Sequence, residues 1–178
     1  PNQTHAYILR SNVAHAEIKS IDTAAAAKAD GVVAIYTGAD IEAAGLGGIP
    51  CGFAPDGGPM NEPPRSVIAQ GKVRFVGDPV AMIVAESVKQ AKTAAQMIVV
   101  DLNSLPAVTS SVEAIKDGAP QLHTEAEKNV CFEWEIGDKD ATEAAFANAD
   151  HVTKLDLINN RKLPNAIEPR VAIGEFEA

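Results

Sequence analysis

Residues 71–108 decide the fold, and they read GKVRFVGDPVAMIVAESVKQAKTAAQMIVVDLNSLPAV. The first part predicts a strand over 73–76 and a sharp bend at Gly77-Asp78-Pro79. The continuous apolar run 80–85 is typical of a strand that is covered on both faces. Apolar residues then recur on one helix face, which predicts a helix over 87–98. A strand over 99–102 follows, so the stretch predicts the order strand, strand, helix, strand.

The residues before this stretch predict further short elements around a long loop. We expect strands over 6–9, 16–21 and 32–36, a helix over 23–29 and one helical turn over 41–44. Asp22 is placed to cap the first helix, and Gly31 to end it. Gly and Pro dominate residues 45–66, which predicts no regular structure there. A loop of this length in a compact domain is often functional.

The residues after this stretch predict a second, incomplete domain. Residues 110–128 are polar and rich in turn-forming residues, so we place a domain boundary near residue 120. Alternating polarity then predicts strands over 130–136, 151–159 and 171–177. A helix is expected over 140–149, with Asp140 and Glu143 at the spacing of a capping box. The fold class is therefore α+β, with helices packed on a mixed sheet, followed by an incomplete α/β segment.

Composition limits the kind of partner that the chain can have. The chain has 178 residues, of which 46% are hydrophobic and 22% charged, and its formal net charge is −9. No basic stripe is visible, so neither nucleic acid nor an anionic membrane surface is an expected partner. No apolar run approaches the roughly 20 residues that span a bilayer. Cys51 and Cys131 form no CxxC pair, and two free thiols in a reducing cytosol are favoured over a disulfide.

Four histidines and one glycine cluster are candidate binding residues. His5, His15, His123 and His151 do not have the i, i+3 or i, i+4 spacing of a helical metal pair, so structural or surface roles are favoured. His15 is of most interest, because it lies in one of the motifs given below. The residues 45–48, GLGG, do not lie between a strand and a helix, so they are interpreted as loop glycines rather than a dinucleotide-binding loop.

Two motifs contain carboxylates. Asp78 could serve as a base, but a bend in which its carboxylate accepts hydrogen bonds from nearby amides is favoured. Glu168-Pro169-Arg170 places a carboxylate and a guanidinium on either side of a proline, and an ion pair or an interdomain contact is favoured over catalysis. No Ser-His-Asp order, phosphate-binding loop or HExxH motif is present.

One colinear set of short motifs resembles the molybdenum hydroxylases, which include xanthine dehydrogenases, aldehyde oxidases and carbon monoxide dehydrogenase large subunits. The first part resembles their a/b hammerhead domain, and the last part resembles the start of their molybdopterin-binding domain. The form Glu168-Pro169-Arg170 resembles the carbon monoxide dehydrogenase branch. The motifs are Arg10-Ser11, Ala14-His15-Ala16, Ser20-Ile21-Asp22-Thr23, Gly31-Val32-Val33-Ala34, Thr37-Gly38-Ala39-Asp40, Gly71-Lys72-Val73-Arg74, Pro79-Val80-Ala81, Leu105-Pro106-Ala107-Val108, Asn160-Arg161, Pro164-Asn165 and Glu168-Pro169-Arg170.

The resemblance implies a hammerhead domain over 1–120 and the leading part of a molybdopterin-binding domain over 121–178. The family's cofactor is molybdenum held by molybdopterin cytosine dinucleotide, with FAD and [2Fe-2S] clusters on partner subunits or domains. Its cofactor loop, active-site segment and glutamate base lie downstream of anything that matches this chain. The resemblance therefore assigns no catalytic, cofactor-binding or metal residue here.

We interpret the chain as a cytoplasmic N-terminal fragment of such a large subunit, a structural scaffold that is inactive alone. The reading frame is then expected to continue beyond Ala178, and the isolated fragment to form dimers or aggregates through open strand edges. Two alternatives stay open. One is a stand-alone binding or interaction module derived from this family, and the other is a regulatory ligand-binding domain that uses the loop 45–66.

Overall fold

The computed structural model describes residues 3–51, 60–160 and 162–175, and the chain forms two compact units, Pro1–Trp134 and Glu135–Ala178. Unit 1 carries every described strand. Its elements are β1 (His5–Arg10), β2 (Ala16–Asp22), η1 (Ala26–Lys28), β3 (Val32–Thr37), α1 (Gly38–Ala43), β4 (Lys72–Val73), β5 (Pro79–Ala85), α2 (Val88–Ala95), β6 (Val99–Ser104), α3 (Ser111–Ala114) and η3 (Glu127–Asn129).

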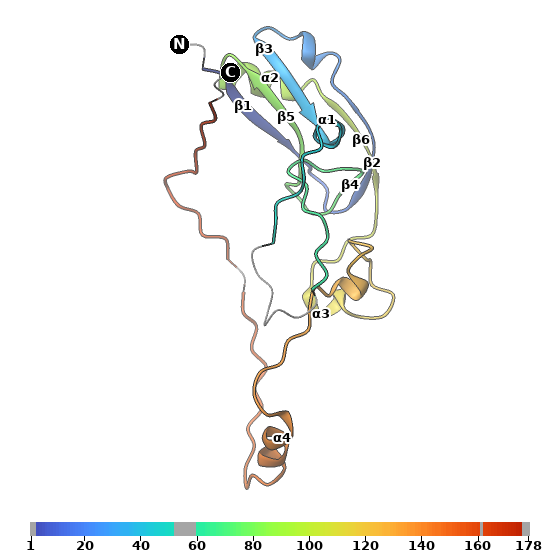
Figure 1. Ribbon diagram of the computed structural model, residues 1–178, viewed down its shortest axis with the longest axis vertical. Coiled ribbons are helices and arrows are strands. Elements are labelled where there is room, and N and C mark those ends of the chain that lie inside the picture. Colours follow the sequence, from blue (N-terminus) through green and yellow to red (C-terminus); the bar gives the residue numbers. More distant parts are fainter. Residues whose placement is uncertain (1–2, 52–59, 161, 176–178) are drawn as a thin grey trace. The chain divides into compact units, whose positions relative to one another are not determined.

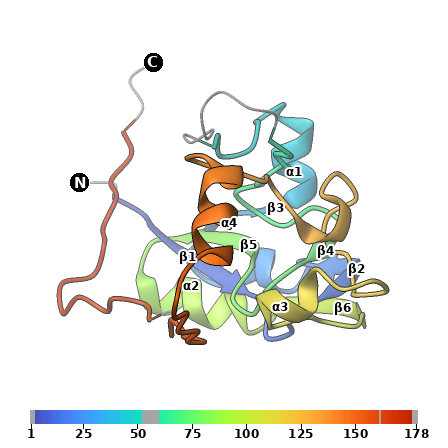
Figure 2. The ribbon, with the colours of Figure 1, turned by 90° about the horizontal axis from the view of Figure 1, so that it is seen from below.

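The apolar strand β5 lies at the centre of a sheet with the order β1-β5-β3. It runs antiparallel to both neighbours, so that Ile83 pairs with Tyr7 on one side and Ile35 on the other. Helix α2 packs against β1 and β5, as Figures 1 and 2 show. The Ser87 side chain caps this helix by accepting a hydrogen bond of 3.3 Å from the Gln90 amide. The central strand and the following helix predicted from the sequence are therefore confirmed.

A second sheet has the order β4-β2-β6, and its pairings are also antiparallel. The two small sheets and the few helices agree with the α+β class predicted from the sequence, with the strands divided between the two sheets. Strand β4 is only two residues long, whereas the sequence predicted a strand over 73–76. The reason is local, because the Arg74 amide donates to the Asp78 carboxylate at 2.9 Å and not to another strand.

Small side chains build the core of unit 1. The side chains of Ala81, Ile83 and Ala85 on β5 are fully buried against Ala91 and Ala94 of α2. A second cluster joins the two sheets, since Val80 of β5 packs with Ala16 of β2 and Val73 of β4. Strand β5 is therefore covered on both faces, as its continuous apolar run predicted. Val88 is an exception on the predicted buried face of the helix. It lies at the first position of α2 and is 45% exposed.

Two predicted helical segments begin elsewhere than expected. The helix predicted over 23–29 is reduced to the 3-10 turn η1, because β2 continues to Asp22, whose carboxylate accepts a 2.9 Å hydrogen bond from the Ala24 amide. Helix α1 is longer than the predicted turn, because Thr37 and Asp40 form a capping box. The Thr37 amide donates to the Asp40 carboxylate at 2.7 Å, which starts the helix directly after β3. The Thr37 hydroxyl donates to the same carboxylate at 2.7 Å, and this hydrogen bond, together with that of the amide, lowers the pKa of Asp40.

The loop residues of unit 1 that are described, 45–51 and 60–66, contain no helix or strand, as predicted.

Asn129 organises the segment that follows β6. Its side chain accepts from the Leu122 amide and donates to the carbonyl groups of Ala114 and Pro120, at 2.9–3.0 Å. The Asn61 amide donates to the Cys131 carbonyl at 2.7 Å, which links this segment to the loop.

Unit 2 contains helix α4 (Lys139–Ala147), which confirms the predicted helix. Its cap is Asp138, whose carboxylate accepts from the Ala141 amide at 2.8 Å, and not the predicted Asp140. The strand predictions were wrong for the described residues of 130–136, 151–159 and 171–175, which form none; residues 176–177 lie outside the described chain. A strand requires a neighbour for its amides and its apolar face, and these segments have none within the described residues.

The apolar side chains of unit 2 are consequently open to solvent. Leu155 is 76% exposed, Leu157 82% and Ile158 88%. Alternating polarity alone therefore does not produce a strand in this unit. Among the described residues, no helix has the length and the apolarity that crossing a bilayer would need.

Candidate functional site

The bend between β4 and β5 gathers most of the buried polar groups of unit 1. Gly77 has a φ of +95°, a conformation that favours glycine. Its amide donates to the Ser11 carbonyl at 2.8 Å, and the Ser11 amide donates to the Asp78 carbonyl at 2.9 Å. The Asp78 carboxylate accepts from the Arg74 amide. The interpretation of Gly77-Asp78-Pro79 as a bend in which Asp78 bonds to a nearby amide is therefore confirmed.

Burial changes the acidity of two side chains at this bend. Asp78 is only 8% exposed, and this burial raises the pKa of its carboxyl group, against the opposing effect of the Arg74 amide and of the Arg74 and Arg10 charges. Burial also lowers the pKa of His123, with the Arg74 charge acting in the same direction. Both side chains are therefore shifted toward their neutral forms.

His15 is buried as a structural side chain, with 6% of its surface exposed. Its Nδ1 lies 2.8 Å from the Pro106 carbonyl oxygen, which ties the start of β2 to the segment after β6. Its Nε2 and the Nδ1 of His123 are buried without a hydrogen-bond partner in the described part of the chain. The structural role favoured for His15 agrees with this contact.

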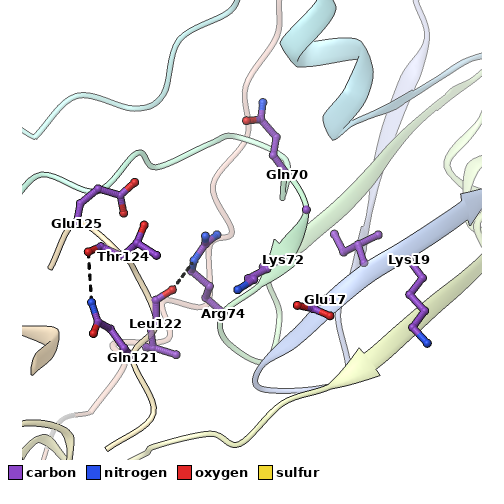
Figure 3. A pocket seen from close by; sticks show the side chains of 11 residues that line it. Glu17, Lys19, Gln70, Lys72, Arg74, Gln121, Leu122, Thr124 and Glu125 are labelled. Atoms are coloured by element: carbon purple, nitrogen blue, oxygen red, sulfur yellow. Dashed lines mark hydrogen bonds between the residues drawn. The ribbon is translucent and has the colours of Figure 1, made fainter. Parts of the chain in front are cut away.

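Two hollows lie beside the bend and share the side chains of Arg74 and Gln70. The first is a groove of about 720 Å³ between β2, β4 and residues 121–125 (Figure 3). The Arg74 Nε donates to the Leu122 carbonyl at 3.0 Å on its wall. Glu17, Lys19 and Lys72 place charges of both signs along it.

The second hollow has a volume of about 450 Å³ and includes Arg10, Arg65, Arg74, Asp78 and His123 in its lining. Sequence reasoning considered Asp78 and His123 but missed the three arginines. They come from β1, from the loop and from the end of β4, so they form no motif that could be recognised in the sequence. Only the fold brings them together.

The other candidates do not form a site within the described residues. The residues 45–48 follow helix α1, where Gly45 has a φ of +67° and its amide bonds to the Glu42 carbonyl at 2.9 Å. They are loop glycines, as predicted. No group of three or more His, Cys, Asp or Glu side chains in the described residues could hold a metal ion. Cys131 is an exposed, free thiol, as expected, and Cys51 is exposed as well.

The remaining motif, Glu168-Pro169-Arg170, lies in unit 2 and is exposed. Neither charged side chain forms a salt bridge with another described residue, so an internal ion pair is not formed there. The alternative prediction, an interdomain contact, stays a prediction.

The two small antiparallel sheets and the few helices define unit 1 as an α+β hammerhead domain. Residues 1–106 match the model of the family described as "aldehyde oxidase and xanthine dehydrogenase, a/b hammerhead domain". The chain belongs to this family.

Curated relatives and solved structures agree with this assignment. The carbon monoxide dehydrogenase large chain of Afipia carboxidovorans is 33% identical over 99% of this chain and 22% of its own length. The nicotine 6-hydroxylase large subunit of Paenarthrobacter nicotinovorans is 34% identical over 98% of this chain and 21% of its own. A crystal structure of Cu,Mo-CO dehydrogenase superimposes with a TM-score of 0.72 at 32% identity, covering 85% of this chain and 20% of that one. The chain thus spans about a fifth of the length of each of these three proteins.

Proposed function

We propose that residues 1–120 are the hammerhead domain, and residues 121–178 the leading part of the molybdopterin-binding domain, of a molybdenum hydroxylase large subunit. The observation that carries this proposal is the family match over 1–106, together with relatives that align with nearly the whole chain over only about a fifth of their own length. Relatives named carbon monoxide dehydrogenase large chain, nicotine 6-hydroxylase large subunit and aldehyde oxidoreductase support the proposal that the whole enzyme oxidises carbon monoxide, an aldehyde or an N-heterocycle.

The role proposed for these residues is structural. The chain shapes the large subunit and helps to wall the substrate route, and the reacting groups belong to other parts of the enzyme. In the cytoplasm, molybdenum with molybdopterin cytosine dinucleotide would be held by later domains, and FAD and [2Fe-2S] by partner subunits or domains. What supports this division is that the relatives extend far beyond the part that this chain matches, since the chain covers 22% and 21% of the length of the first two.

The most direct test of the structural role measures the metal content and the activity of the 1–178 chain. Residues 1–178 are purified after expression in a host that makes the molybdenum cofactor. Bound molybdenum is measured by mass spectrometry, and dye reduction is followed with carbon monoxide or an aldehyde. We expect neither metal nor turnover. Stoichiometric molybdenum together with substrate-dependent dye reduction would show that the chain has an active site of its own.

A second test uses the complete large subunit with its partner subunits. A substitution that disturbs the hammerhead core should lower the amount of assembled enzyme and leave kcat per bound molybdenum unchanged. Gly38→Ala is suited to this test, because a Cβ at Gly38 would lie 2.2 Å from the Ala69 carbonyl oxygen. Gly47→Ala is the matched control, since a Cβ there meets nothing within 4 Å. A fall in kcat per molybdenum for G38A would argue for a direct catalytic role.

Association of the isolated chain belongs to the same proposal. The exposed side chains of Leu155, Leu157 and Ile158 offer an apolar surface that water does not solvate well. We expect the 1–178 chain to form dimers or larger particles as its concentration rises, measured by light scattering. The variant Leu157→Asp should reduce this association. A monodisperse monomer at every concentration would contradict the expectation.

A further inference from the structure

The hollow of about 450 Å³ in unit 1 has the size of a small-molecule site, since such sites range from about 300 to 1,000 Å³. Three arginines line it, and they come from three separate parts of the fold. Arg10 ends β1, Arg65 lies in the described loop, and Arg74 follows β4. The hollow is therefore formed by this chain's own residues, and its occupant does not depend on the function proposed above.

The guanidinium charges of the hollow are only partly balanced by described carboxylates, since the charges of Arg74 and Arg10 act on Asp78 and that of Arg74 also acts on Glu125. None of the three guanidinium groups forms a salt bridge with a described residue. Arg10 donates through Nη1 to the Gly77 carbonyl, and Arg74 donates through Nε to the Leu122 carbonyl. The terminal nitrogens of Arg74 and the whole Arg65 guanidinium thus keep their donors, as far as the described residues show.

One acidic side chain, Asp78, lies in the lining and offsets only part of these charges. Asp78 is buried, and its carboxylate is used by the Arg74 amide. Three guanidinium groups therefore face one carboxylate in a protein whose net charge is −9. A local positive site within an acidic protein attracts small anions and concentrates them.

The rest of the lining is apolar, with Ile49, Val67 and Phe75 among its members. Val67 is 43% exposed and Phe75 is 55% exposed, so both offer surface that a ligand could cover. Guanidinium groups pair with planar carboxylates through two parallel hydrogen bonds. We propose that this hollow binds a small organic carboxylate, with the carboxylate on the arginines and an apolar body against Ile49, Val67 and Phe75.

The test uses benzoate as the probe and the 1–178 chain labelled with ¹⁵N, carrying Leu157→Asp in unit 2 to limit its association. Benzoate is titrated at constant ionic strength and neutral pH, and backbone amide shifts are followed. We expect saturable shifts for Arg65, Val67 and Phe75, with helix α4 unaffected. Benzamide has the same shape without the charge, and it should cause no saturable shift. Equal responses to benzoate and benzamide would overturn the proposal.

Substitutions separate the pocket from general electrostatics. Arg65→Gln should weaken benzoate binding about fivefold, the effect expected for loss of one partly exposed charge pair. Arg65 is exposed and its side chain makes no hydrogen bond to a described residue, so the fold should persist, as circular dichroism would verify. Arg170→Gln removes the same charge from unit 2 and should leave the affinity unchanged. Equal affinities of R65Q and R170Q would overturn the proposal.

Two further anions test the apolar part of the hollow. Acetate carries the carboxylate without the ring, and inorganic phosphate carries charge without either feature. Both should bind more weakly than benzoate if the apolar wall is used. Phosphate or acetate that binds as tightly as benzoate would show a simple anion site and would overturn the proposed carboxylate specificity.

Discussion

Units 1 and 2 contain similar alternating or continuous apolar patterns, yet among the described residues only those of unit 1 form strands. Ile83 of β5 is fully buried between Tyr7 and Ile35 on the neighbouring strands, whereas Ile158 in unit 2 is 88% exposed. The difference lies in the partners, because β5 has a strand on each side and a helix on one face. A strand-like sequence pattern therefore forms a strand only where the fold provides a neighbouring strand to pair with it.

The largest expected effect of a single substitution comes from exchanging the two isoleucines for alanine. Ile83→Ala should lower the free energy of unfolding of unit 1 by about 4 kcal/mol, because it leaves a cavity in a packed core. Ile158→Ala should change it by less than about 0.5 kcal/mol. Urea denaturation followed by circular dichroism measures both. Similar losses for the two variants would mean that residue 158 is buried in solution and would break the comparison.

The next effect concerns the packing of α1 against the loop that precedes β4. Gly38→Ala should cost about 2 kcal/mol, since the new methyl group would collide with the Ala69 carbonyl oxygen. The neighbouring Gly47→Ala adds the same methyl group to open space and should have little effect. The same denaturation experiment compares them, and a G38A variant as stable as G47A would show that the close approach is relieved at no cost.

The smallest expected effect is a pH dependence at the bend. Burial raises the pKa of Asp78 in the folded state above the ordinary value of 3.8, so the folded protein holds this proton more tightly than the unfolded chain does. The stability that this provides is present below pH 3.8 and is lost as the pH rises through the folded-state pKa. Asp78→Asn removes the titration.

Unfolding free energies of the wild type and D78N, measured from pH 4 to pH 8, test this sign. The stability of the wild type should fall relative to that of D78N as the pH rises. A difference that stays constant with pH, or one that changes in the opposite direction, would contradict the raised pKa.

Much of unit 1 could be predicted from residues 71–108, because local signals there agree with one another. The apolar run of β5, the cap at Ser87 and the small residues of α2 all indicate the structure that forms. The length of β4 could not be predicted, because it depends on one hydrogen bond between the Arg74 amide and the Asp78 side chain. A side chain that competes for a backbone amide leaves little trace in the pattern of polarity.

The candidate site was predicted less completely than the fold. Asp78 and His123 could be singled out by residue type, and the bend at Asp78 could be predicted from its glycine and proline neighbours. The arginines of the hollow could not, since Arg10 and Arg74 meet only after β1 pairs with β5. Lysines and arginines scattered among acids look like an ordinary solvated surface in the sequence.

The central claim is that unit 1 is a folded hammerhead domain built on β5, while the described residues of the apolar segment 151–175 have no strand partner among the described residues. Hydrogen–deuterium exchange of the 1–178 chain, at a concentration where it is monomeric, tests both halves in one measurement. We predict that the amides of β5 exchange most slowly and that those of residues 151–159 exchange as fast as an unstructured peptide. Protection of residues 151–159 comparable to that of β5 would contradict the account.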